Sequence, residues 1–199
     1  MVACCSIKLI QYRHQNGLTI ISNNLIMEEI KDKKAPKKRT YVRLGDVYCV
    51  ECDKYKRYFQ YFAKDETNMK SPVIRVFEKK YGLEENPNVE EIVKDDVDFY
   101  AHTYFISVGV ENNYWYKYSK SKNLGSQEDI VFKMYFYPSP KYATISHEWY
   151  IWKLNQKRIF IGDLPRKYRK CTVGYIYSAL TIYGKIKTGK WPIKGCDVI

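Results

Sequence analysis

Short segments rich in aromatic and β-branched residues recur along the chain, and they constrain the fold more than any other feature. Charged or turn-forming residues separate them, as is typical of successive strands. Tyrosine occurs 20 times; it favours strands and can cover a sheet face while its hydroxyl stays in water. The segments that we predict as strands are 41–50, 57–63, 73–77, 99–110, 114–118, 130–137, 148–154 and 158–161.

This succession predicts a mainly β fold, an antiparallel barrel or sandwich with one or two short helices. Apolar residues recur at helical spacing within the acidic stretch 82–98, which indicates a short surface helix. Between Ile176 and Ile186 the apolar residues are spaced by three or four, which predicts a C-terminal helix over about 172–187.

Length predicts a single β-rich domain over residues 39–199, with its basic C-terminal helix and tail, preceded by an N-terminal extension and basic linker over residues 1–38. We expect the extension to be weakly ordered. Met27 opens a segment that resembles an ordinary polar protein start, so residues 1–26 are either an extension or a misassigned start. No stretch approaches the ~18 apolar residues of a membrane-spanning helix, and no secretory signal is evident, so we expect a cytoplasmic protein.

Six cysteines are present, and two of them form a C-x-x-C pattern, Cys49 and Cys52. Without a secretory signal the thiols should stay reduced. The pair falls inside a strand pattern, where residues i and i+3 point to opposite faces. Structural cysteines are therefore favoured, with a metal site or a redox pair as the alternatives.

The net charge of +12 is concentrated in two parts of the chain. Residues 31–43 carry seven basic residues and one acid, and residues 153–194 carry eleven basic residues and one acid. The strands between them are nearly balanced. Such a field steers an acidic protein or a polyanion toward the chain, and a solvated lysine-rich surface is the third interpretation.

No segment of the sequence has a complete catalytic motif. Residues 184–190 match G-x-x-x-x-G-K, but a phosphate loop needs Ser or Thr next, and Trp191 stands there. A dyad of Cys49 with one of the later histidines, in a metal-independent hydrolase, stays an alternative. We therefore predict no enzyme, no cofactor and no metal. The histidines, too few and too scattered for a metal triad, are His14, His102 and His147.

Three early segments, residues 43–50 with their Gly-Asp pair, 56–63 and 73–77, resemble the opening of the immunity protein 26 family of polymorphic toxin systems. Downstream, residues 150–152 and then Asp-Leu-Pro at 163–165 are similar to the family's later portion. The resemblance covers roughly residues 40–165. It implies a mostly β fold and a role as the antidote of a bacterial toxin, acting by binding and occlusion without chemistry.

We therefore expect an immunity-type protein that neutralises a cognate toxin by direct binding, the toxin presenting an acidic patch. The alternative is a nucleic-acid-binding module that uses the basic C-terminal region and the aromatic strands. The sequence assigns neither the toxin nor an oligomeric state. We expect the partner to contact exposed aromatic and basic side chains, namely Tyr114, Trp115, Tyr116, Trp149, Trp152, Arg166, Lys167, Arg169 and Lys170.

Overall fold

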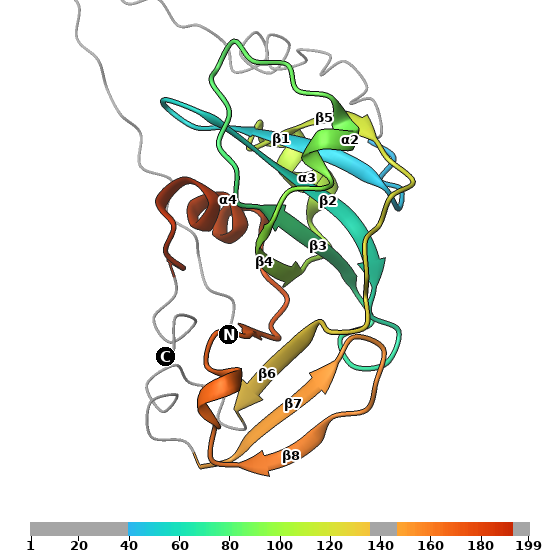
Figure 1. Ribbon diagram of the computed structural model, residues 1–199, viewed down its shortest axis with the longest axis vertical. Coiled ribbons are helices and arrows are strands. Elements are labelled where there is room, and N and C mark those ends of the chain that lie inside the picture. Colours follow the sequence, from blue (N-terminus) through green and yellow to red (C-terminus); the bar gives the residue numbers. More distant parts are fainter. Residues whose placement is uncertain (1–39, 136–146, 193–199) are drawn as a thin grey trace, which may run out of the picture. The chain divides into compact units, whose positions relative to one another are not determined.

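The computed structural model describes residues 40–135 and 147–192, which belong to one unit of the chain, residues 40–199. The predicted extension over residues 1–38, with Met27, lies outside the described residues. The described part holds nine strands in two sheets and three α-helices (Figure 1). A mainly β fold with short helices, one of them near the C-terminus, is confirmed. The described strands form two sheets and no closed barrel.

The first sheet is antiparallel throughout, with the strand order β4-β3-β2-β1-β5. Its first strand begins after a bend at Gly45, whose φ is 89°. A Cβ at this position would lie 2.5 Å from the carbonyl oxygen of Ser121, so only glycine fits. The five strands are β1 (Asp46–Glu51), β2 (Lys56–Lys64), β3 (Pro72–Phe77), β4 (Val97–His102) and β5 (Tyr116–Lys120).

Both faces of this sheet are covered. On one face Tyr48 and Phe59 pack in a cluster with residues of α3 and α4, and on the other Cys49 and Tyr58 pack with residues of α2. Many tyrosines are therefore interior and do not cover a wet surface: Tyr48 and Tyr58 are fully buried. The sequence pattern predicts the strands of this sheet, but it does not predict that both faces of the sheet are covered.

The second sheet has the order β8-β7-β6-β9, in which β6 and β9 are parallel. The successive predicted strands 148–154 and 158–161 form an antiparallel hairpin, β7 and β8, and Asn155 in its turn adopts a φ of 61°. A third core cluster joins residues of the two sheets, among them Phe62 of β2 and Trp152 of β7. The strands are β6 (Val131–Tyr135), β7 (Trp149–Lys153), β8 (Ile159–Gly162) and β9 (Thr172–Val173).

Helix α2 (Val89–Ile92) confirms the predicted surface helix, and the side chain of Asn88 caps it by accepting from the backbone N–H of Glu90. Helix α4 (Ala179–Thr188) begins later than residue 172, because Ser178 caps it and β9 takes residues 172–173. Gly189, with a φ of 73°, ends it. None of the described helices is long and apolar enough to cross a membrane.

The prediction of one strand over residues 99–110 is wrong. Strand β4 ends at His102, and helix α3 (Ile106–Glu111) follows it. The hydroxyl of Thr103 accepts a hydrogen bond from the backbone N–H of Phe105, which stabilises the turn between them. Tertiary packing overrides the β propensity of this stretch, because α3 places its glycine, Gly109, against the ring of Trp115.

Candidate functional site

A buried polar junction links the two sheets. The Nε2 of His102, at the end of β4, lies 3.1 Å from Oδ2 of Asp65, which follows β2. The indole N–H of Trp152, in β7, donates to the same oxygen at 3.3 Å. The backbone N–H groups of Thr67 and Asn68 donate to the other oxygen at 3.0 and 2.9 Å. All of the carboxylate's acceptor sites therefore face donors.

Burial and hydrogen bonding set the charges of this junction in opposite ways. Burial lowers the pKa of His102 to about 4, although Asp65 favours the protonated ring. Burial alone would raise the pKa of Asp65, but the bonds from Asn68, Thr67 and His102 outweigh it, and the pKa is lowered. At neutral pH an ionised carboxylate therefore accepts from a neutral imidazole. The contacts at this junction form a hydrogen-bond network between the two sheets, and Nδ1 of His102 has no hydrogen-bond partner among the described residues.

The candidate cysteine nucleophile lies elsewhere. Cys49 belongs to the core cluster on one face of the first sheet, and Cys52 belongs to the cluster on the other, so the C-x-x-C pair points to opposite faces as expected. Burial raises the pKa of both thiols, which disfavours the reactive thiolate. His102, a proposed dyad partner, bonds to Asp65 instead. Within the described ranges, no group of three His, Cys, Asp or Glu side chains is arranged to hold a metal ion.

The expectation that three tryptophans are exposed is wrong. Trp115, Trp149 and Trp152 are 3%, 2% and 1% exposed. Each indole fills a core cluster, and the N–H of Trp115 donates to the carbonyl oxygen of Ile106 at 2.9 Å. The sequence places Trp149 and Trp152 on opposite faces of one strand, and both are buried because both faces of β7 are covered.

Two further predicted residues lie at the start of strand β5, Tyr114 just before it and Tyr116 as its first residue. Tyr114 is half-buried, and its ring stacks on Tyr183 with the centroids 5.0 Å apart. Tyr116 is 42% exposed, and its hydroxyl donates to Glu51 at 3.1 Å. Their neighbours belong to the five-stranded sheet and to α4. The predicted basic residues lie in another part of the fold, between β8 and β9 of the four-stranded sheet.

The predicted basic residues are exposed on a short segment after β8 that contains one 3-10 turn, η2 (Arg166–Tyr168). A buried amine holds this segment to the sheet: Nζ of Lys133, in β6, donates to the carbonyl oxygen of Arg169. Burial lowers the pKa of Lys133 to about 8. Lys133 is thus a positioning residue that sequence reasoning missed, because the strand pattern alone places it as one more alternating polar residue.

We call the exposed basic side chains between residues 157 and 170, together with Ile159 and Phe160, the basic edge. Ile159 and Phe160 of β8, at 58% and 57% exposed, lie in it between basic neighbours. The only acid in this stretch is Asp163, which is itself paired with His147. Within the described part of the chain none of the six basic side chains pairs with a carboxylate. The members of the basic edge are Lys157, Arg158, Ile159, Phe160, Arg166, Lys167, Arg169 and Lys170.

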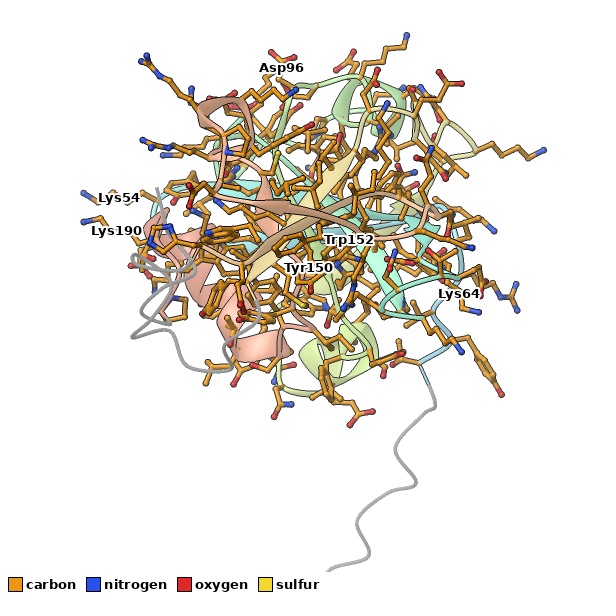
Figure 2. The ribbon with its side chains drawn as sticks, turned by 90° about the horizontal axis from the view of Figure 1, so that it is seen from below. Lys54, Lys64, Asp96, Tyr150, Trp152 and Lys190 are labelled. Carbon is orange, nitrogen blue, oxygen red and sulfur yellow. The ribbon has the colours of Figure 1, made fainter. Side chains whose placement is uncertain are left out.

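Basic side chains also project elsewhere on the surface. Lys54, Lys64 and Lys190 lie at the margins of the view in Figure 2. Lys64, however, is paired with Glu66 at 2.9 Å, and Lys187, near Lys190 in the chain, is paired with Asp53 at 2.8 Å. What distinguishes the basic edge is the combination of unpaired charge with exposed apolar side chains.

No family model matches the chain, and neither a curated protein nor a solved structure matches it. The resemblance to the immunity protein 26 family therefore stays a prediction from the residues that carry it.

Proposed function

We propose that the chain is a non-catalytic binding protein whose basic edge docks on an acidic face of a partner protein, as an immunity protein does on its cognate toxin. The observation that carries the proposal is the basic edge itself. Its six basic side chains are exposed and have no carboxylate partner among the described residues, so a partner's acids can neutralise them without first breaking ion pairs.

The interior supports the same proposal. Two of its ionisable side chains are engaged in holding the fold: His102 is bonded to Asp65, and Arg75 is bonded to Gln60 at 2.9 Å. The exposed pair Ile159 and Phe160 adds apolar area between the charges. Apolar anchors within a charged surround are typical of protein interfaces, and aromatic and arginine residues often dominate their binding free energy.

Nucleic acid is the second candidate, because the same unpaired charges attract phosphates. Exposed Ile159 favours protein over nucleic acid, since an aliphatic side chain contributes little to phosphate contacts. A mixed oligonucleotide at ~50 mM salt separates the two candidates. Binding that weakens steeply with added salt would support nucleic acid and contradict the protein interface.

The direct test is growth of cells that co-express the chain with a toxic protein encoded beside its gene. We expect the wild-type chain to restore growth and the quadruple variant Arg166→Glu, Lys167→Glu, Arg169→Glu, Lys170→Glu to restore none. The matched control reverses as many exposed charges elsewhere, at Lys54, Lys94, Lys120 and Lys122. No rescue by the wild-type chain contradicts the immunity function, and equal loss in both variants contradicts the role of the basic edge.

A further inference from the structure

Strand β8 is an edge strand of unusual character. It pairs with β7 on one side, and within the described residues no strand pairs with its other side (Figure 1). The edge strand β4 is paired at its end by a later segment of the chain. His102 forms a β-bridge with Ile176, and the carbonyl oxygen of His102 accepts from the N–H of Tyr177. The edge strand β5 carries lysines, a usual protection against unwanted pairing.

The side chains of β8 are exposed on both faces of the sheet. Ile159 and Phe160 are consecutive, so they point to opposite faces, and each is more than half exposed. The ring of Phe160 lies beside that of Tyr150 in β7, with the centroids 5.2 Å apart. An added strand would therefore meet an edge that no described strand occupies, with an apolar side chain to pack against on each face.

The charge around β8 selects the occupant. Lys157 and Arg158 precede the strand, and Arg166 and Lys167 follow it, all exposed. The chain's own segment 31–43 carries seven basic residues against one acid, so its charge repels it from this edge. A second copy of the chain would bring the same basic residues to face these. An extended segment that carries acidic residues and presents an apolar residue on each of its faces satisfies both the charges and the exposed side chains.

We propose that β8 binds such a segment of the partner protein by strand addition, extending the four-stranded sheet to a fifth strand. The inference rests on the proposed function, because it names how the partner of the basic edge is held. Main-chain hydrogen bonds give the segment its register, and the side chains flanking Ile159 and Phe160 give specificity. The strand is short, with four residues, so the added segment is short as well.

The probe is a short capped peptide in which pairs of Glu alternate with pairs of Val, so that each face carries both, added to the full chain, with a Lys-Val peptide of the same pattern as control. We expect exchange of the backbone amides of β8 with deuterium to slow at least ~10-fold at saturation, while those of β5 are unchanged. The Lys-Val peptide should give no protection. Binding of the Glu-Val peptide without protection of β8, or equal protection by both peptides, would overturn the proposal.

A matched pair of variants tests the side chains. We expect Phe160→Asp to weaken the peptide at least ~10-fold, because it removes the apolar contact and adds a repelling charge. Leu180→Asp, at an apolar residue of α4 that is 61% exposed, should leave the affinity unchanged. Equal weakening in both variants contradicts strand addition at β8. Concentration-dependent dimerisation that Phe160→Asp abolishes would also overturn the proposal, since the occupant would then be a second copy.

These outcomes separate this inference from the proposed function. If charge reversal of the basic edge abolishes rescue while β8 stays unprotected, the function stands and strand addition is wrong. If the peptide protects β8 but the wild-type chain rescues no cell from the neighbouring toxin, strand addition stands and the immunity function is wrong.

Discussion

The two sheets differ in how completely the fold encloses them. In the five-stranded sheet, Phe59 and its neighbours are fully buried, and even the charged side chain of Arg75 bonds inside, to Gln60 and to the carbonyl oxygen of Asn123. In the four-stranded sheet, β8 exposes apolar side chains on both faces beside unpaired charges. A sheet whose apolar side chains are buried on both faces contributes stability, and an exposed apolar edge is available for interaction.

The largest expected effect on the free energy of unfolding comes from a comparison of two phenylalanines in strands of different sheets. Phe59 lies 5.1 Å from both the Tyr48 and Trp115 rings and is fully buried, whereas Phe160 is 57% exposed. We expect Phe59→Ala to lower the free energy of unfolding by about 3–5 kcal/mol, and Phe160→Ala to change it by less than about 0.5 kcal/mol. Urea denaturation measures both. Equal losses would show that β8 is as integral to the fold as β2.

The next test addresses the junction that joins the sheets. The unfolded chain binds a proton on His102 near pH 6.5 and the folded chain only near pH 4, so acidification favours unfolding. The stability that this difference contributes is present above pH 6.5 and is lost as the pH falls to 4, a loss of roughly 3 kcal/mol. Urea denaturation at several pH values measures it.

Two histidine variants control this test. His102→Gln should remove most of the pH dependence in that range, and His147→Gln should preserve it, because His147 is 83% exposed. A dependence that survives in His102→Gln would show that the two sheets are not coupled through this residue.

A third test sharpens the contrast within the helices that cover the first sheet. A Cβ at Gly109 of α3 would lie 2.0 Å from the ring of Trp115, so Gly109→Ala should destabilise by about 1–3 kcal/mol. At Gly184 of α4 the nearest atom, in Pro192, is 3.5 Å away. Gly184→Ala should therefore stabilise by up to about 1 kcal/mol through helix propensity. Thermal unfolding measures the change in stability of both variants. A stabilising Gly109→Ala would mean that α3 packs loosely against Trp115.

The smallest expected effect is on the stability of the basic edge itself. Because Arg166, Lys167, Arg169 and Lys170 are exposed and unpaired among the described residues, reversing each should change the free energy of unfolding by less than about 0.5 kcal/mol. Urea denaturation of the quadruple variant measures this. A large loss would mean that these charges serve the fold, and the contrast between the sheets would disappear.

Much of the fold could be predicted from the sequence, because runs of apolar and aromatic residues indicate strands from the local sequence alone. The first three strands, the β7–β8 hairpin and α2 all follow from such patterns. The failures have physical causes. The predicted strand 99–110 is interrupted by the turn that Thr103 stabilises. Strand β9 forms only because residues 172–173 pair with β6, which is distant in sequence.

Only part of the candidate site could be predicted from the sequence. The exposure of Arg166 to Lys170 follows from local charge, since isolated charges are rarely buried. The burial of Trp149 and Trp152 does not follow, because it depends on which elements cover both faces of β7. The bond between Asp65 and His102 leaves no spacing signal either, since the fold alone brings these residues together.

The order of the elements along the chain has a consequence for synthesis. The five strands of the first sheet are complete at residue 120, but α4, which covers one of its faces, comes at residues 179–188, and β6 meets its parallel neighbour only at residue 172. On a chain emerging from the ribosome, this apolar face therefore lacks its α4 cover until residues 179–188 have been made. Such nascent chains fold late and are exposed to aggregation, so this protein should depend on chaperones more than its size alone suggests.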